Sequence, residues 1–387
     1  MDESDEWRAW LTALRTPGMG PGALRERLQA TGNDIHAALA QLRHGGSAAS
    51  QPARDWLRHP DANLLDADLA WLAQPGHRLL RCVDADFPPQ LEHIPQPPAA
   101  LFVVGDASAL LYPQVAIVGA RAASASGLAH AGVFARALAQ AGFAITSGLA
   151  DGIDGAAHAA TLDVGGLTLA VMGTGPDLVY PRKHQALAAR IAAHGALISE
   201  FPLGTGPRAD HFPRRNRLIA GLSLGTVVVE AGLRSGSLIT ARLAGEQGRE
   251  VFAMPGSIHN PLARGCHRLI RDGARLVEEA AEIVETLAPA ARMLGGALAE
   301  RLAAEPSARD VVPAAVTSAT PPQVRLAHAG CDSLLRELGH DPATLDELAE
   351  RTGEASAVLS SQLLMLELDG AVERLAGNRY QRLTPGR

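Results

Sequence analysis

Small and hydroxyl-bearing residues follow four apolar runs of this sequence, a pattern typical of phosphate-binding loops. Glycine lets the backbone turn closely, so that successive amide groups can point at an anion, and a nearby arginine adds positive charge. If the runs are parallel strands, their carboxyl ends meet at one edge of a sheet, where such folds bind ligands. The candidates are Gly119, Arg121, Ser147, Gly148, Gly173, Ser235, Gly236 and Ser237.

A second candidate is a basic and aromatic segment with the sequence Phe-Pro-Arg-Arg-Asn-Arg. A base can stack on an aromatic ring while guanidinium groups hold the phosphates, as at many single-stranded nucleic acid sites. Arg208 and His211 lie close by and favour this interpretation. The alternative is an amphipathic helix with a core phenylalanine and solvated arginines. We expect contacts to nucleic acid from Phe212, Arg214, Arg215, Asn216 and Arg217.

Asp151, Asp154 and His158 fall at helical spacing and could share one face of a helix. A metal or acid–base role is conceivable, but we favour a structural one, in which Asp151 caps the helix and the others satisfy buried loop amides. A serine nucleophile elbow, a Walker lysine and a metal-spaced Cys/His set are all absent from the sequence. The full G-x-G-x-x-G pattern is also missing, which disfavours NAD. We therefore assign no catalytic residue, no metal and no cofactor.

Regular alternation of short apolar runs and helical patterns begins at Val115. It predicts an α/β fold, a Rossmann-like doubly wound and mostly parallel sheet. The expected strands are 115–119, 143–147, 167–172, 196–199, 225–229 and 250–254. The expected helices are 126–141, 152–162, 182–194, 212–222, 237–248 and 261–271, with a last helix at 278–287.

The regions on either side of this core differ from it in composition. Residues 1–75 predict a small helical domain whose Gly-Met-Gly turn resembles a helix-hairpin-helix motif, although a plain glycine turn is the alternative. Within the core domain, 78–288, the Pro-rich stretch 78–113 looks irregular apart from one strand at 100–104. Residues 289–327 predict an Ala/Pro-rich linker, partly helical near 290–304. Residues 328–387 predict a winged-helix domain, with helices at 334–338, from 344 and at 356–369, and a hairpin of 370–374 with 379–382.

Composition limits the class of protein. The chain has 387 residues and a net charge of −6, so any nucleic acid site must be a local patch. Three scattered cysteines argue against a disulfide framework, and Lys183 is the only lysine. The sequence contains neither a signal-peptide pattern nor an apolar run long enough for a membrane span. We expect a cytoplasmic protein that does not engage a membrane.

At these motifs the chain resembles the DNA-processing protein A (DprA/Smf) family. The similar segments are Val-Gly-Ala-Arg (118–121), Ser-Gly-Leu-Ala-Asp-Gly-Ile-Asp (147–154), Phe-Pro-Arg-Arg-Asn-Arg-Leu-Ile-Ala-Gly-Leu-Ser (212–223), Val-Glu-Ala-Gly-Leu-Arg-Ser-Gly-Ser-Leu-Ile-Thr-Ala (229–241) and Met-Pro-Gly-Ser (254–257). The resemblance implies a homodimeric binder of single-stranded DNA that protects incoming strands in natural transformation and helps load the RecA recombinase. It also implies DNA contacts from Arg121 and Phe212–Arg217, a pocket lined by the candidate loop residues, and dimer contacts late in the core.

Two other functions stay open. One is a nucleotide phosphoribohydrolase resembling the lysine-decarboxylase-like family, although its Pro-Gly-Gly-x-Gly-Thr loop is replaced here by Arg-Ser-Gly-Ser-Leu-Ile-Thr and Glu230 lies upstream. The other is a nucleotide-sensing regulator with the winged helix as output. From Cys331 to Arg387 there are 10 acidic and 6 basic side chains, a balance of 6 − 10 = −4. Because a duplex-reading wing is normally basic, we expect a protein-contact or regulatory role for this region.

Overall fold

The structure is a computed structural model. It describes residues 3–44 and 50–304 and, beyond them, residues 334, 343–352, 359, 362, 363, 366, 371–375 and 379–382. Two compact units divide the chain, Met1–Pro306 and Ser307–Arg387, and each is considered by itself.

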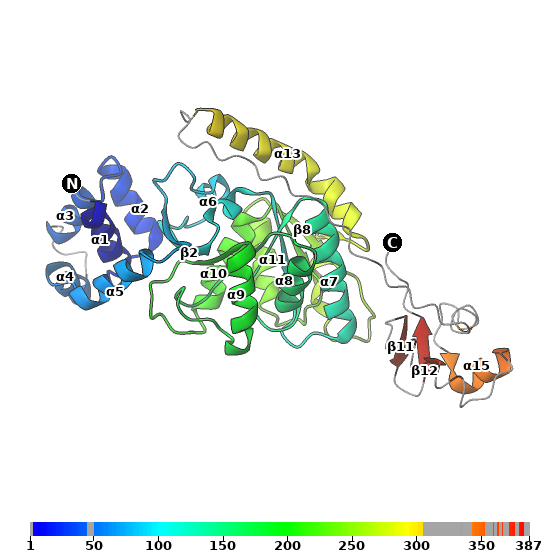
Figure 1. Ribbon diagram of the computed structural model, residues 1–387. Coiled ribbons are helices and arrows are strands. Elements are labelled where there is room, and N and C mark those ends of the chain that lie inside the picture. Colours follow the sequence, from blue (N-terminus) through cyan, green and yellow to red (C-terminus); the bar gives the residue numbers. More distant parts are fainter. Residues whose placement is uncertain are drawn as a thin grey trace. The chain divides into compact units, whose positions relative to one another are not determined.

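A nine-stranded sheet forms the centre of the first unit, in the order β1-β2-β6-β5-β4-β3-β7-β8-β9. Helices lie around it (Figure 1). Seven strands, from β6 to β9 in that order, run parallel, and β2 joins β6 antiparallel. The fold is therefore α/β with a mostly parallel sheet, as predicted. The strands are β1 His77–Arg81, β2 Ala100–Gly105, β3 Gln114–Val118, β4 Ala144–Ser147, β5 Thr168–Val171, β6 Ala196–Ser199, β7 Gly225–Val228, β8 Glu250–Ala253 and β9 Arg275–Leu276.

Helices cover both faces of this sheet because its strands are apolar on both sides. In β3, Ala116 and Val118 pack against α10 and α11, whereas Val115 and Ile117 pack against α7 and α8. This period of two is what a strand buried on both faces requires. The helices are α6 Pro89–Glu92, α7 Ala125–Gln140, α8 Ile153–Asp163, α9 Gln185–His194, α10 His211–Leu222, α11 Ser237–Glu246, α12 Arg264–Arg271 and α13 Ala280–Ala304, with 3-10 turns η1 Ala107–Leu111 and η2 Arg182–His184.

Two expectations need correction. Residues 78–81, which belong to the stretch expected to be irregular, form the edge strand β1 together with His77. The only apolar residues of this strand are two adjacent leucines, a run too short to predict a strand. Its extended conformation depends on pairing with β2. The helix expected at 278–287 and the helical part expected near 290–304 are one continuous helix that passes through Pro289, because the residues after Pro289 are rich in helix-favouring Ala and Leu. Residues 305–327 of the expected linker lie outside the described residues.

The N-terminal helices share a core with the sheet edge. They are α1 Glu3–Leu14, α2 Pro21–Ala30, α3 Ile35–His44, α4 Gln51–Arg58 and α5 Ala62–Leu72. Leu79 and Phe102, from β1 and β2, belong to the same apolar cluster as Trp10 and Trp71. Arg15 adds a polar link, because its guanidinium bonds both oxygens of Asp68 at 2.5 and 2.6 Å and the carbonyl of Leu203 at 3.1 Å.

The second unit contains a three-stranded antiparallel sheet, in the order β10-β12-β11. Its elements are β10 Ala343–Thr344, α15 Leu345–Thr352, β11 Val372–Leu375 and β12 Arg379–Arg382. Val372 pairs with Arg382, so the predicted hairpin is present. Leu348, Leu363 and Tyr380 contribute to a small apolar core. Most of the helices predicted at 334–338 and 356–369 lie outside the described residues.

We expect Arg15→Ala to lower the free energy of unfolding by about 3 kcal/mol, because the fully buried Asp68 would lose its partner. Arg8→Ala is the matched control, since Arg8 pairs with Asp66 where both side chains are exposed. Denaturant titration of both variants would measure the difference. Equal stability of the two would contradict the assignment of Arg15 as a structural link.

Candidate functional site

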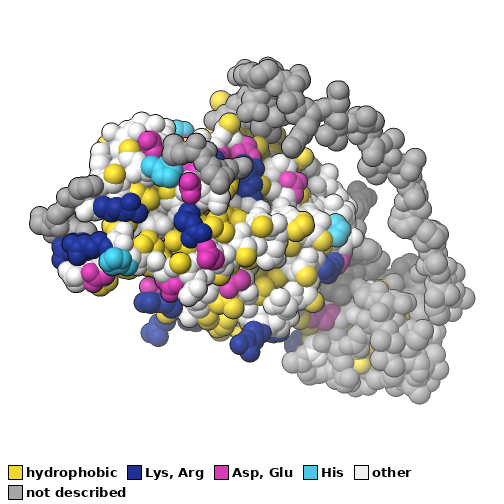
Figure 2. All heavy atoms as spheres, turned by 60° about the vertical axis from the view of Figure 1, so that its left-hand side comes forward, with side chains coloured by type: hydrophobic (Ala, Val, Ile, Leu, Met, Phe, Trp, Pro, Cys, Tyr) yellow, Lys and Arg dark blue, Asp and Glu magenta, His cyan; other side chains and the backbone are white. Residues whose placement is uncertain are grey.

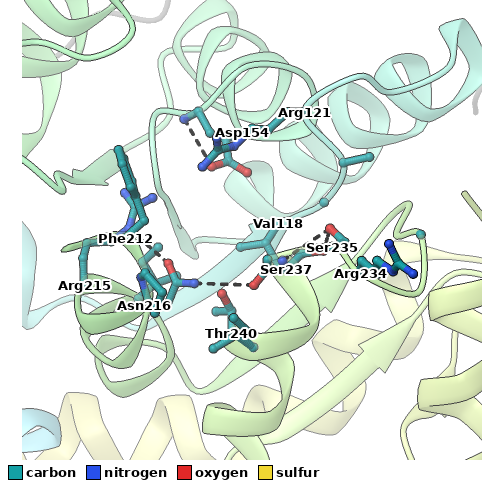
Figure 3. Close-up of a pocket in the computed structure, with 18 of the residues that line it drawn as sticks. Val118, Arg121, Asp154, Phe212, Arg215, Asn216, Arg234, Ser235, Ser237 and Thr240 are labelled. Carbon is teal, nitrogen blue, oxygen red and sulfur yellow. Dashed lines mark hydrogen bonds between the residues drawn. The ribbon is translucent and has the colours of Figure 1, made fainter. Parts of the chain in front are cut away.

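A cavity of about 820 Å³ opens beyond the carboxyl ends of β3 and β7 (Figure 3). Strand β3 lies between β4 and β7. The helices that follow β3 and β4 cover one face, and those that flank β7 cover the other. This is a topological switch point, where open α/β sheets bind ligands. The loop after β3, the first turns of α8 and α10, and the loop before α11 supply the walls.

The loop that carries Arg121 is held against the end of β7. The Ala120 amide donates to the Glu230 carbonyl at 2.7 Å. A Cβ on Gly119 would lie 2.5 Å from Cγ1 of Ile153 and 2.9 Å from the Glu230 carbonyl oxygen, so only glycine allows this approach. Arg121 is itself exposed and faces the cavity.

The Glu230 side chain secures the other end of the same loop. Its Oε2 accepts a hydrogen bond from the Ser124 amide at 2.9 Å, and its Oε1 accepts one from the Ser124 hydroxyl at 2.6 Å. Ser124 in turn caps α7 by accepting from the Gly127 amide at 3.0 Å. The buried carboxylate is therefore occupied in fixing the start of α7.

Arg215 is a buried cation at the cavity wall. Its Nη1 donates to the carbonyl of Gly148 at 2.6 Å and to that of Val171, and its Nε donates to Oδ1 of Asn216 at 3.1 Å. The pKa of Arg215 is lowered from 12.5 to about 10, mainly because the side chain is buried; the Asp154 charge opposes this shift, and the Arg121 charge adds to it. Arg215 therefore stays charged at neutral pH and presents positive charge to any ligand.

Phe212 lies between cationic and aromatic neighbours. The guanidinium carbons of Arg121 and Arg215 lie 5.4 and 5.9 Å from its ring centroid, and the Tyr180 ring lies 5.7 Å away. The ring is partly buried yet lines the cavity, so it offers a surface on which a base could stack.

The N-terminus of α11 faces the same cavity, since Gly236, Ser237 and Thr240 all line it. The hydroxyls of Ser235 and Ser237 lie 2.7 Å apart, and Asn216 Nδ2 donates to the carbonyl of Gly236 at 3.5 Å. A helix N-terminus with hydroxyl groups and the adjacent Arg234 suits a phosphate.

The charge of the cavity differs in sign from that of the chain. Its described lining holds four arginines, Arg121, Arg208, Arg215 and Arg234, against one acid, Asp154, a balance of 4 − 1 = +3. Elsewhere the charges are mixed. Figure 2 shows a face on which Lys and Arg side chains lie interspersed with Asp and Glu. Positive charge is therefore concentrated at the cavity, although the chain as a whole has a net charge of −6.

Of the predicted residues, Gly119, Arg121, Phe212, Arg215, Asn216, Ser235, Gly236 and Ser237 line the cavity. Five others do not. Gly148 and Gly173 lie behind the side chains that line it. A Cβ on Gly148 would lie 2.5 Å from Nη2 of Arg215, and a Cβ on Gly173 would lie 2.9 Å from Cδ1 of Phe212. Ser147 is fully buried and donates to the carbonyl of Ile117 at 2.6 Å. These three shape the site without facing it.

Arg214 and Arg217 are the other two predicted residues that do not line the cavity. Both pair with Glu200, Arg214 at 3.3 Å, and Arg217 is only 6% exposed. Arg214 also lies over the ring of Phe201, 5.2 Å from its centroid. Residues three apart share one side of a helix, whereas Arg215 points elsewhere. A run of arginines cannot show this division, because it depends on the position of Glu200.

Sequence reasoning missed Arg234 and Tyr180 as lining residues. Arg234 directly precedes the predicted loop Ser235–Ser237, and Tyr180 follows the Gly-Thr-Gly turn after β5. Their positions beside predicted loops could have indicated them, but only the fold brings both side chains to the cavity.

Asp151, Asp154 and His158 do not form one site. Asp151 pairs with Lys183 at 3.0 Å rather than capping α8, whose N-cap is Gly152. Asp154 lines the cavity, and its Oδ2 accepts from the Ala150 amide at 3.2 Å. His158 is fully buried and bonds Thr168 through Nδ1 at 2.7 Å. Within the described part of the chain, no group of three or more His, Cys, Asp or Glu could hold a metal ion.

Comparison with known proteins places this architecture in one family. Residues 78–288 match the model of DNA recombination-mediator protein A, and residues 318–378 match that of the DprA winged helix domain. Protein Smf of Escherichia coli is 45% identical over 349 residues, which cover 90% of this chain and 88% of Smf. DNA processing protein DprA of Streptococcus pneumoniae is 46% identical over 193 residues, 50% of this chain and 68% of that protein.

Two solved structures are similar. The X-ray structure of Streptococcus pneumoniae DprA superposes with a TM-score of 0.64 at 34% identity, covering 72% of this chain and 97% of that one. A Helicobacter pylori DNA processing protein A, described for its single-stranded DNA binding mode, gives a TM-score of 0.50 at 29% identity, covering 55% and 96%.

The fold and cavity define a Rossmann-like protein with an arginine-lined cavity at its switch point, followed by a winged-helix region. The chain belongs to the DNA recombination-mediator protein A (DprA/Smf) family. None of the described helices is both long and apolar enough to cross a membrane.

His158 should make stability depend on pH. Burial, followed by the charges of His184 and Arg215, lowers the pKa of His158 from 6.5 to about 3. Between these values the unfolded chain binds a proton that the folded chain does not, so stability falls as pH decreases below 6.5, by at most about 1.4 kcal/mol per pH unit.

We expect His158→Gln to flatten this slope in denaturant titrations between pH 4.5 and 7, a range within the window set by those pKa values. Replacement of the exposed His194 by Gln controls for the loss of one histidine. An unchanged slope in His158→Gln would show that other groups cause the acid sensitivity.

Proposed function

We propose that the chain binds single-stranded DNA in the cavity between β3, α10 and α11 and acts as a recombination mediator without catalysing a reaction. The observation that supports this most is the combination of four arginines, a stacking ring and a helix N-terminus in one cavity. Arginines and amides can hold phosphates while Phe212 stacks on a base. The similar Helicobacter pylori protein is described as a single-stranded DNA binder.

The hydrolase alternative receives less support. A phosphoribohydrolase needs an acidic group that can act on the substrate, but Glu230 is buried and hydrogen-bonded to Ser124. A nucleotide-sensing role is compatible with the cavity, and tight binding of a mononucleotide with weak binding of an oligonucleotide would favour it. The protein-contact or regulatory role of the acidic C-terminal region also stays a proposal.

We also propose that the chain loads RecA, functions in natural transformation and is located in the cytoplasm, as its resemblance to the DprA/Smf family implies. RecA loading would be measured as a shortened lag in ATP hydrolysis by RecA on single-stranded DNA. The function in transformation would be measured as uptake of a selectable marker by a strain that lacks this gene.

We expect Arg121→Ala to weaken binding to a mixed-sequence single-stranded oligonucleotide about tenfold. Loss of one phosphate contact should also reduce the slope of log affinity against log salt by about 0.7. Fluorescence anisotropy across a salt series, with duplex DNA as competitor, would measure both effects. The control is Arg190→Ala, since Arg190 pairs with Asp163 outside the cavity. Identical salt slopes for both variants would argue against the proposed site.

We also propose a homodimer formed through the edge of the sheet at β9. Leu276 on β9 is 48% exposed, and Ile258, in the loop after the neighbouring β8, is 73% exposed. An edge strand with exposed apolar side chains can pair with a second copy. Leu276→Glu should lower the mass measured by light scattering from dimer to monomer. Val133→Glu on α7, similarly exposed, should leave the mass unchanged. A wild-type monomer would refute the proposal.

A further inference from the structure

Among the described residues that line the cavity, Asp154 is the one acidic side chain beside four arginines. It is only 6% exposed. Its Oδ2 accepts from the Ala150 amide at 3.2 Å. Burial raises the pKa of Asp154, and the charge of Arg215 opposes this rise. The hydrogen bond from the amide orients the side chain, so an acceptor group faces a cavity that otherwise attracts anions.

The two ends of the cavity therefore suit different parts of a nucleotide. Arg234 and the Ser235–Ser237 loop form one side, and Asp154 lies on the side nearer Arg121 and Phe212 (Figure 3). A phosphate is attracted to the N-terminus of α11 and repelled by the carboxylate. The group that contacts Asp154 must offer hydrogen-bond donors, and in a DNA strand those donors are on the bases.

We propose that Asp154 makes the cavity select guanine, whose N1–H and N2 amino group donate side by side to the two carboxylate oxygens. The inference rests on the proposed binding of single-stranded DNA. A carboxylate offers acceptors only. Adenine and cytosine place a ring acceptor beside their amino donor, and thymine flanks its N3–H with two carbonyls, so each of these bases would bring an acceptor against Asp154. Phe212, at the same end of the cavity, provides the ring on which the base stacks.

A structural role for Asp154 leads to a different expectation. Its charge acts on the buried Arg215, whose pKa it raises against the effect of burial. If this compensation were its sole role, removal of the charge would change binding to all oligonucleotides by the same factor. Guanine selection instead changes the ratio between two oligonucleotides.

The test measures binding of the full-length chain to labelled oligothymidylates that are identical except for one central base: thymine, guanine, hypoxanthine, adenine or cytosine. Hypoxanthine keeps N1–H but lacks the N2 amino group. We expect the guanine oligonucleotide to bind about tenfold more tightly than the thymine one, as a good bidentate contact allows. The hypoxanthine oligonucleotide should lose most of this preference.

The same ratio is measured in Asp154→Asn and in Asp151→Asn. Asp151 belongs to the same segment but pairs with Lys183 and does not line the cavity. The guanine-to-thymine ratio should fall towards one in Asp154→Asn and stay at the wild-type value in Asp151→Asn.

Equal wild-type affinity for guanine and thymine oligonucleotides would overturn the inference, as would a preference that survives in Asp154→Asn. In both cases binding itself would persist and the proposed function would stand. Absence of binding to every oligonucleotide would refute the proposed function. If Asp154→Asn fails to fold, the comparison of guanine with hypoxanthine on the wild-type protein still decides the question.

Discussion

The site depends on one buried positive charge. A guanidinium removed from water costs several kcal/mol unless polar groups replace its hydration. At Arg215 the replacement comes from the carbonyls of Gly148 and Val171, at the ends of β4 and β5, and from Asn216. The arginine therefore joins α10 to the carboxyl edge of the sheet while its charge faces the cavity. This link also fixes the direction of α10, so Phe212 reaches the cavity one turn earlier, whereas Arg214 and Arg217 turn towards Glu200.

The positive charge of the cavity would attract a polyanion only at short range. The chain as a whole is acidic, with a net charge of −6, so its long-range field does not attract DNA. At physiological salt, charges act over about 8 Å, and four arginines around one cavity dominate within that distance. Discrimination against other anions must come from the shape of the site and the stacking surface rather than from overall attraction. This agrees with an aromatic ring that lies 5.4 Å from the nearest arginine guanidinium.

Much of the fold could be predicted from the sequence because the strands that form the sheet are buried on both faces. Such strands appear as continuous apolar runs, and six of them were located within a residue or two, from β3 to β8. Strand β1 could not be predicted this way, since its pairing with β2 depends on contacts distant in sequence. The course of α13 through Pro289 was also not evident, because proline normally ends a helix.

Eight of the predicted site residues line one cavity at the carboxyl edge of the sheet, and the structure gives several of the glycines a packing role besides the one expected. At Gly119, Gly148 and Gly173 a side chain would collide with Ile153, Arg215 and Phe212 respectively. These glycines give room to neighbouring side chains rather than expose amides to an anion. Gly236, in contrast, has open space around it and lies at the N-terminus of α11. A strand followed by glycine therefore indicates the edge of the sheet at which the cavity lies. Whether that glycine contacts the ligand or makes room for the residue that does depends on side chains packed from other elements, which the local sequence does not specify.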